Sequence, residues 1–86
     1  MMSVKTRQMT AAIKAFEKDA DIDVMHCIEI DINHFNMVCS TRLSMQETWD
    51  HVRDEMPANL RLSKVTFETM FGGGLRADFL VEFDPE

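Results

Sequence analysis

Hydrophobic residues recur along the chain at two different spacings, which together predict six elements. Over residues 5–18 the apolar positions follow one another at intervals of three and four, so they share one face of a helix. That face consists of Met9, Ala12, Ile13 and Phe16. Over residues 22–32 the spacing changes to two, which is typical of a strand.

In this strand the residues that share the predicted inner face are Val24, His26, Ile28, Ile30 and Ile32. The tight turn expected at Asn33-His34 leads into a third element, over 35–41, that pairs back on the strand before it. Its predicted inward residues are Phe35, Met37 and Cys39.

A second helix is predicted after Ser44. Ser44 and Glu47 form a capping box, in which each side chain accepts from the other residue's backbone N–H. The apolar stripe that follows is Met45, Trp49, Val52 and Met56. Pro57 ends the helix, because it has no N–H to donate and disfavours helical backbone at the residue before it. Asp50 and His51 fall outside the stripe and are predicted to face solvent.

Two further strands surround the three consecutive glycines at 72–74 and predict a hairpin. With those glycines as the loop, Phe71 opposes Leu75 on the predicted inner face. On the outer face Glu68 opposes Asp78, and like charges so placed are expected to repel. The order is therefore α-β-β-α-β-β over a single domain, 1–86. We predict an α+β fold of two layers, with a four-stranded, mainly antiparallel sheet and both helices on one face. A ubiquitin-like roll with an added N-terminal helix fits the same pattern.

Composition and charge exclude some classes of binding partner. The chain has 86 residues, with 15 acidic and nine basic residues and a formal net charge of −6. An acidic protein lacks the basic footprint that direct binding to nucleic acid or anionic lipid requires, whereas a basic protein partner suits it. No apolar run is long enough to span a membrane, and the first residues lack the apolar core of a secretory signal. We therefore expect a cytoplasmic protein.

The cysteines and histidines do not predict a metal or catalytic site. The two cysteines lack the Cys-x₂-Cys spacing of a zinc site, and the histidines lack the His-x₃-His spacing. Strict alternation also places Cys27 and Cys39 on opposite sides of the sheet. An internal disulfide is therefore not expected. No nucleophile has a base beside it, and the glycine run leads into a strand rather than into a phosphate-binding helix. We predict no catalytic residue, cofactor or metal.

The outer face of the predicted sheet combines acidic and apolar residues, and we expect it to bind a partner. Met adapts to irregular surfaces, and the chain contains eight methionines. The candidate partner-binding residues are Glu29, Asp31, Glu68, Asp78, Glu82, Arg76, Met70 and Leu80.

The stretch from Ile28 to Phe83 resembles the small, acidic, cofactor-free effector proteins of multicomponent diiron monooxygenases. The similarity lies in a hairpin, a serine-capped helix, and Leu60-Arg61-Leu62 leading into an apolar strand that ends at glycine. In that family a Leu-Gly-Arg-Pro-Phe-like segment closes the second helix, where this chain has Arg-Asp-Glu-Met-Pro-Ala over 53–58. The resemblance implies a protein whose docking alters another enzyme's active site.

Three functions follow as expectations. The first is a small interaction or regulatory module that binds a basic protein through the sheet face. The second is the oxygenase effector. The third is a small oligomeric ligand-binding protein or enzyme. Homodimerisation through the open face or an edge strand is expected to add to the stability of so small a domain.

Overall fold

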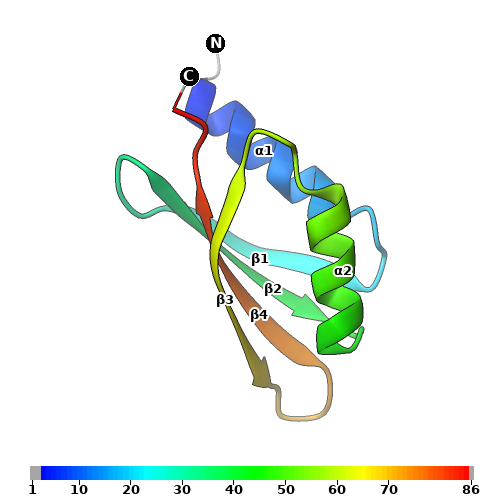
Figure 1. Ribbon diagram of the computed structural model, residues 1–86. Coiled ribbons are helices and arrows are strands. Elements are labelled where there is room, and N and C mark those ends of the chain that lie inside the picture. Colours follow the sequence, from blue (N-terminus) through cyan, green and yellow to red (C-terminus); the bar gives the residue numbers. More distant parts are fainter. Residues whose placement is uncertain (1–2, 86) are drawn as a thin grey trace.

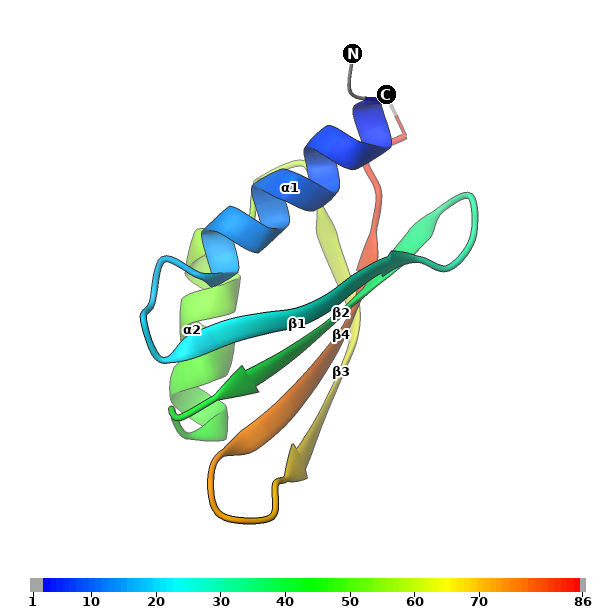
Figure 2. The ribbon, with the colours of Figure 1, turned by 180° about the vertical axis from the view of Figure 1, so that it is seen from behind.

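The elements lie in the predicted order, and they form a four-stranded antiparallel sheet with two helices on one face (Figures 1 and 2). The structure, a computed structural model, describes residues 3–85. The elements are α1 (Val4–Phe16), β1 (Ile22–Glu29), β2 (His34–Thr41), α2 (Met45–Glu55), β3 (Arg61–Thr69) and β4 (Leu75–Glu82). Within the sheet the strands are ordered β1-β2-β4-β3, so β2 and β4 are central. The predicted α+β fold is confirmed.

The first helix begins at a serine cap and ends earlier than predicted. The Ser3 hydroxyl oxygen accepts from the backbone N–H of Thr6 at 3.1 Å. Ala12 and Phe16 are fully buried against the sheet. The helix stops at Phe16, and the Glu17 carboxylate instead accepts from the backbone N–H of Val24 on β1 at 3.0 Å. Glu17, the first residue after the helix, therefore bonds β1 through its side chain.

A β-bulge in β1 changes which residues face the core. Val24 lies opposite Cys39, but the next paired residue is His26, opposite Val38, so Met25 is the extra residue. Beyond the bulge Cys27 faces the helices, and Ile28 faces away from them. The predicted inner face of β1 is therefore correct only at its start, because strict alternation does not allow for an inserted residue. The strand also ends at Glu29, earlier than predicted.

The second strand and the second helix follow their predictions closely. Phe35, Met37 and Cys39 are fully buried. The capping box is present: the N–H of Glu47 donates to the Ser44 hydroxyl at 3.1 Å, and the N–H of Ser44 donates to the Glu47 carboxylate at 3.2 Å. These bonds satisfy backbone N–H groups that have no partner within the first turn.

The stripe of α2 is only partly buried. Val52 is fully buried and Thr48 lies beside it, where its hydroxyl shares a hydrogen bond of 3.0 Å with the Thr41 hydroxyl of β2. Met45, predicted to be part of the stripe, is instead exposed. The helix thus contacts β2 through a polar pair that the apolar spacing did not reveal.

The β3–β4 hairpin has a register that differs from the prediction by two residues. Phe67 lies opposite Ala77, and Thr69 opposite Leu75, so the turn spans 70–74 rather than the three glycines alone. This pairing sets the large Phe67 ring across from a small residue and leaves it in edge contact with Phe79, at 6.3 Å between ring centroids. Phe71, predicted to face inward, lies in the turn instead.

The core is built from the inner faces of the strands and both helices. Phe16 of α1 meets Phe79 of β4 edge to face, with 5.0 Å between their centroids. Such pairs add about 0.5–1.5 kcal/mol to the effect of burial alone. The fully buried side chains of largest volume are Phe16, Phe35, Phe79, Ile22, Met37, Val52 and Val81.

Two polar side chains tie α1 to the rest of the fold. The half-buried ring of His51 on α2 lies 3.1 Å from the carbonyl oxygen of Ala15, at the end of α1, so the prediction that it faces solvent is wrong. The buried Gln8 amide bonds the backbone of Asp84 on both sides: it donates to the carbonyl and accepts from the N–H. This clamp holds the C-terminal segment against α1.

Candidate functional site

The sheet face that points away from the helices is uncovered along all four strands (Figure 1). We call it the outer face. Register and alternation assign its residues. They are Asp23, His26, Ile28, His34, Asn36, Val38, Ser40, Arg61, Lys64, Thr66, Glu68, Arg76, Asp78, Leu80 and Glu82.

Most of the predicted partner-binding residues lie on the outer face, and three lie elsewhere. The members on the outer face are Glu68, Arg76, Asp78, Leu80 and Glu82. Met70 is in the β3–β4 turn. Glu29 points to the helix side because of the bulge, and its carboxylate pairs with the Lys5 ammonium at 3.0 Å. Asp31 lies in the β1–β2 turn, 3.0 Å from the His34 ring.

The observed register also changes the charge pairing of the outer face. Glu68 lies opposite Arg76, and Arg61 opposite Glu82. The predicted repulsion between Glu68 and Asp78 is therefore wrong, because Asp78 lies opposite the neutral Thr66. Opposite charges across a strand pair stabilise it modestly, whereas like charges destabilise it. Two carboxylate–arginine pairs thus lie at the two ends of the β3–β4 half of this face.

The middle of the outer face is apolar and tightly arranged. Val38 is only 4% exposed although no helix covers it, so its neighbours on the face shield it. Leu80 is half-buried, and Ile28 is exposed. The Asn36 amide donates to the Asp78 carboxylate and, at 3.2 Å, to the carbonyl of Phe79. The face therefore has an ordered, partly apolar centre with charged residues around it.

Large apolar side chains are also exposed on β1 and in the turns of both hairpins. Met25, Ile28, Ile30 and Ile32, in β1 and the turn after it, have exposed fractions between 51% and 75%. Phe71 in the other turn is 108% exposed. Sequence reasoning assigned the isoleucines and Phe71 to the core, because an alternating apolar run does not reveal a bulge or the length of a turn.

The two cysteines lie on the helix side of the sheet, which corrects the prediction that they occupy opposite faces. Cys39 pairs with Val24 before the bulge and Cys27 with Met37 after it. Burial raises the pKa of the Cys27 thiol to about 11 and that of the Cys39 thiol to about 12. At neutral pH both are thiols rather than thiolates, and the thiolate is the nucleophilic form.

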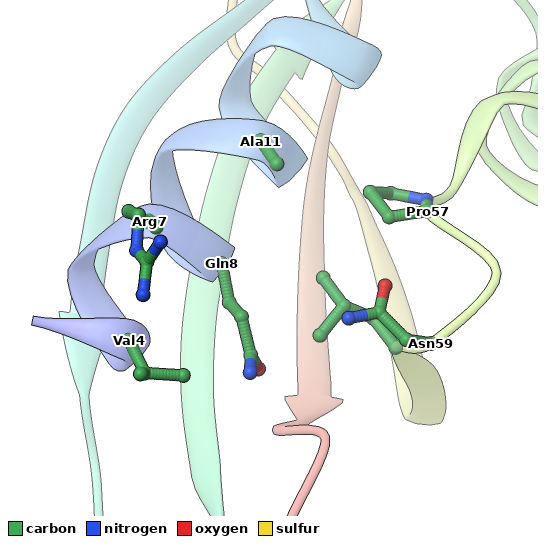
Figure 3. Close-up of a pocket in the computed structure, with 7 residues that line it drawn as sticks. Val4, Arg7, Gln8, Ala11, Pro57 and Asn59 are labelled. Carbon is green, nitrogen blue, oxygen red and sulfur yellow. The ribbon is translucent and has the colours of Figure 1, made fainter. Parts of the chain in front are cut away.

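A pocket of about 240 Å³ lies between α1 and the connection from α2 to β3 (Figure 3). Arg7 and Gln8 on α1 line one side, and Pro57 and Asn59 line the other. Gln8 is committed to the backbone of Asp84. Sites for drug-sized ligands usually measure about 300–1,000 Å³ and are mostly enclosed. This pocket is smaller, and it does not favour a ligand site over the outer face.

Within residues 3–85, no group of three or more His, Cys, Asp or Glu side chains is placed to hold a metal ion. Nor does the described part of the chain contain a helix with the length and apolar character needed to cross a membrane. Comparison with protein-family models, curated proteins and solved structures finds no match to this chain.

Proposed function

We propose that this chain is a protein-binding module and that the outer face is its docking surface. The observation that supports this most is the layout of that face, in which the half-buried Leu80 and the exposed Ile28 lie beside two carboxylate–arginine pairs. Protein interfaces have this anatomy, with an apolar core inside a polar rim. A sheet face that only meets solvent is usually polar at alternate positions along each strand.

The charge of the chain favours a basic partner. The net charge of −6 attracts a positively charged surface over distances longer than any contact, which raises the rate of encounter. On the face itself, Glu68 and Glu82 each lie opposite an arginine, so a partner must present basic groups between acidic ones to match them. We expect the apolar centre to provide affinity and the charged rim to provide register.

The test compares variants of the full chain as bait in a lysate of the source organism. The outer-face variant is Glu68→Gln with Glu82→Gln and Leu80→Ala, which removes two charges and part of the apolar centre. The control is Asp50→Asn with Asp54→Asn, which removes the same charge from α2. We expect one stoichiometric basic protein on the wild type and the control, at least tenfold less on the outer-face variant, and less on every bait at ~0.5 M salt because exposed charges are then screened.

Circular dichroism and urea unfolding show that each bait is folded. A partner that the outer-face variant retains as well as the control does would overturn the proposal. So would a chain that captures no protein in stoichiometric amount at low salt. Capture alone does not support the proposal, because only the difference between the two variants locates the docking surface.

A further inference from the structure

The ring of His34, at the first position of β2, lies between two carboxylates. Its Nδ1 atom is 3.0 and 3.2 Å from the two carboxylate oxygens of Asp31, in the β1–β2 turn. Its Nε2 atom is 4.0 Å from a carboxylate oxygen of Glu82, directly opposite on β4. The side chain of His34 is 27% exposed, so water screens these contacts only in part. Both ring nitrogens therefore face groups that only accept hydrogen bonds.

These contacts determine where the neutral ring carries its hydrogen. An ionised carboxylate cannot donate, so the short contacts with Asp31 require a hydrogen on Nδ1. The pKa of the Asp31 carboxyl is lowered, chiefly by this bond and then by the bond from the Asn33 N–H at 2.8 Å. In neutral His34 the lone pair of Nε2 therefore faces Glu82. A proton added to the ring goes to Nε2 and changes this contact from repulsive to attractive.

The contact lies where the β1–β2 turn bonds the end of β4. The backbone N–H of Phe83, the residue after β4, donates to the Asn33 carbonyl at 2.8 Å. The side chains of His34 and Glu82 meet beside this bond. The same turn presents Ile32, of which 75% is exposed. The charge on His34 therefore acts on the attachment of a turn that presents a large apolar side chain.

Charged groups on the neighbouring elements are engaged with other partners. On the helix side, Lys5 of α1 and Glu29 of β1 form an ion pair at 3.0 Å. In the segment after β4, the Asp84 carboxylate accepts from the Asn59 amide at 3.3 Å. These groups leave Asp31 and Glu82 as the carboxylates that face the ring.

The proton on His34 also sets the charge of this end of the outer face. Arg61 of β3 lies opposite Glu82, on the side away from His34. Asp31 and Glu82 contribute two negative charges, while Arg61 and a protonated His34 contribute two positive charges. The row that crosses the turn and three strands is therefore balanced with the proton and has a charge of −1 without it.

We propose that His34 is a proton-controlled link between the β1–β2 turn and β4. Histidine is the side chain that ordinarily gains or loses a proton between about pH 5 and about pH 8. Opening the turn would separate the charged ring from both carboxylates, so the closed turn binds the proton more tightly than the open turn does. The turn is therefore held more firmly at about pH 5.5 than at about pH 8, where Nε2 has no hydrogen to direct at Glu82.

Nitrogen-15 NMR on the full chain tests where the hydrogens lie. At about pH 8 we expect a neutral His34 with its hydrogen on Nδ1, because Asp31 accepts from that atom. The exposed His26, by contrast, should show the Nε2–H form that predominates in free histidine. At about pH 5 both nitrogens of both rings should carry hydrogen.

Hydrogen exchange at the Phe83 amide measures how firmly the turn bonds β4. Corrected for the intrinsic pH dependence of exchange, its protection should fall about two- to fivefold from about pH 5.5 to about pH 8, as expected for the loss of a partly exposed ion pair. His34→Gln keeps a donor for Asp31 but takes up no proton, so its protection should not change with pH. The matched control, His26→Gln, removes the other imidazole of the β1–β2 pair and should behave as the wild type.

Three results would overturn the proposal: a hydrogen on Nε2 of neutral His34, protection at Phe83 that does not change with pH in the wild type, and a His34→Gln variant that responds to pH as His26→Gln does. The spectrum of each variant shows whether it is folded, and the measurement of the ring hydrogens requires no variant. The inference does not rest on the proposed function, because every measurement is made on the isolated chain.

Discussion

Raising the pH above the ordinary pKa of a thiol is expected to destabilise this fold through Cys39. The side chain is fully buried on β2, and burial raises its pKa from 9.0 to about 12. Between these values the unfolded chain releases the proton and the folded chain keeps it. Stability therefore falls as the pH rises wherever the unfolded state binds fewer protons. The contribution of this thiol is unchanged below about pH 8 and declines from about pH 9 to about pH 12.

The size of the effect follows from the same two values. At about pH 10 a thiol with a pKa of 9.0 is roughly nine-tenths ionised, whereas one with a pKa near 12 remains protonated. Relative to about pH 8, the free energy of unfolding should fall by about 1.4 kcal/mol from Cys39 alone. Cys27 is only half-buried, so solvent screens its contribution and we expect a smaller loss there.

Urea unfolding at about pH 8 and about pH 10, in the presence of a reductant, measures this loss in the wild type and in Cys39→Ala. Alanine leaves a small cavity and lowers stability at both pH values, but that cost cancels in the difference between them. Other groups that titrate cancel between the two proteins. We expect the variant to lose about 1.4 kcal/mol less than the wild type. Equal losses would show that the fold does not hold this thiol protonated.

Two further predictions concern contacts that the sequence did not reveal. Gln8→Ala removes both hydrogen bonds to the backbone of Asp84 and should lower the free energy of unfolding in urea by about 1–2 kcal/mol. The exposed control, Gln46→Ala, should lower it by less than about 0.5 kcal/mol. Equal losses would mean that the Gln8 clamp does not stabilise the fold. Gly74→Ala should lower the melting temperature more than Gly72→Ala. Both have positive φ, but only at Gly74 would a Cβ come within 3.2 Å of a backbone carbonyl of β2; the reverse order would contradict that close approach.

Local signals predicted the elements well because each has a short-range cause. The capping box at Ser44 needs only residues three apart, and the inward side of β2 follows from alternation over one uninterrupted strand. The second helix also ends next to Pro57, as expected. The order of elements and the α+β class follow from these signals. What the local signals leave undetermined is how the helices and the sheet pack together.

The candidate site was predicted less completely because it depends on how strands pair. The bulge at Met25 turns Glu29 from the outer face to Lys5, and the two-residue difference in register sets Glu68 against Arg76 instead of Asp78. A bulge depends on how two strands pair. The length of a turn depends on which side chains of the two strands pack opposite each other. Neither leaves a mark in the alternation of a single strand.

The sequence by itself therefore determined the elements, their order and their caps, since these depend on neighbours within a few positions. Tertiary structure alone decided the faces of β1, the register of β3 and the contact of His51 with α1. It also decided that Phe71 lies outside the core. These features are set by packing and hydrogen bonding between segments far apart in the chain, and such partners become neighbours only when the layers come together.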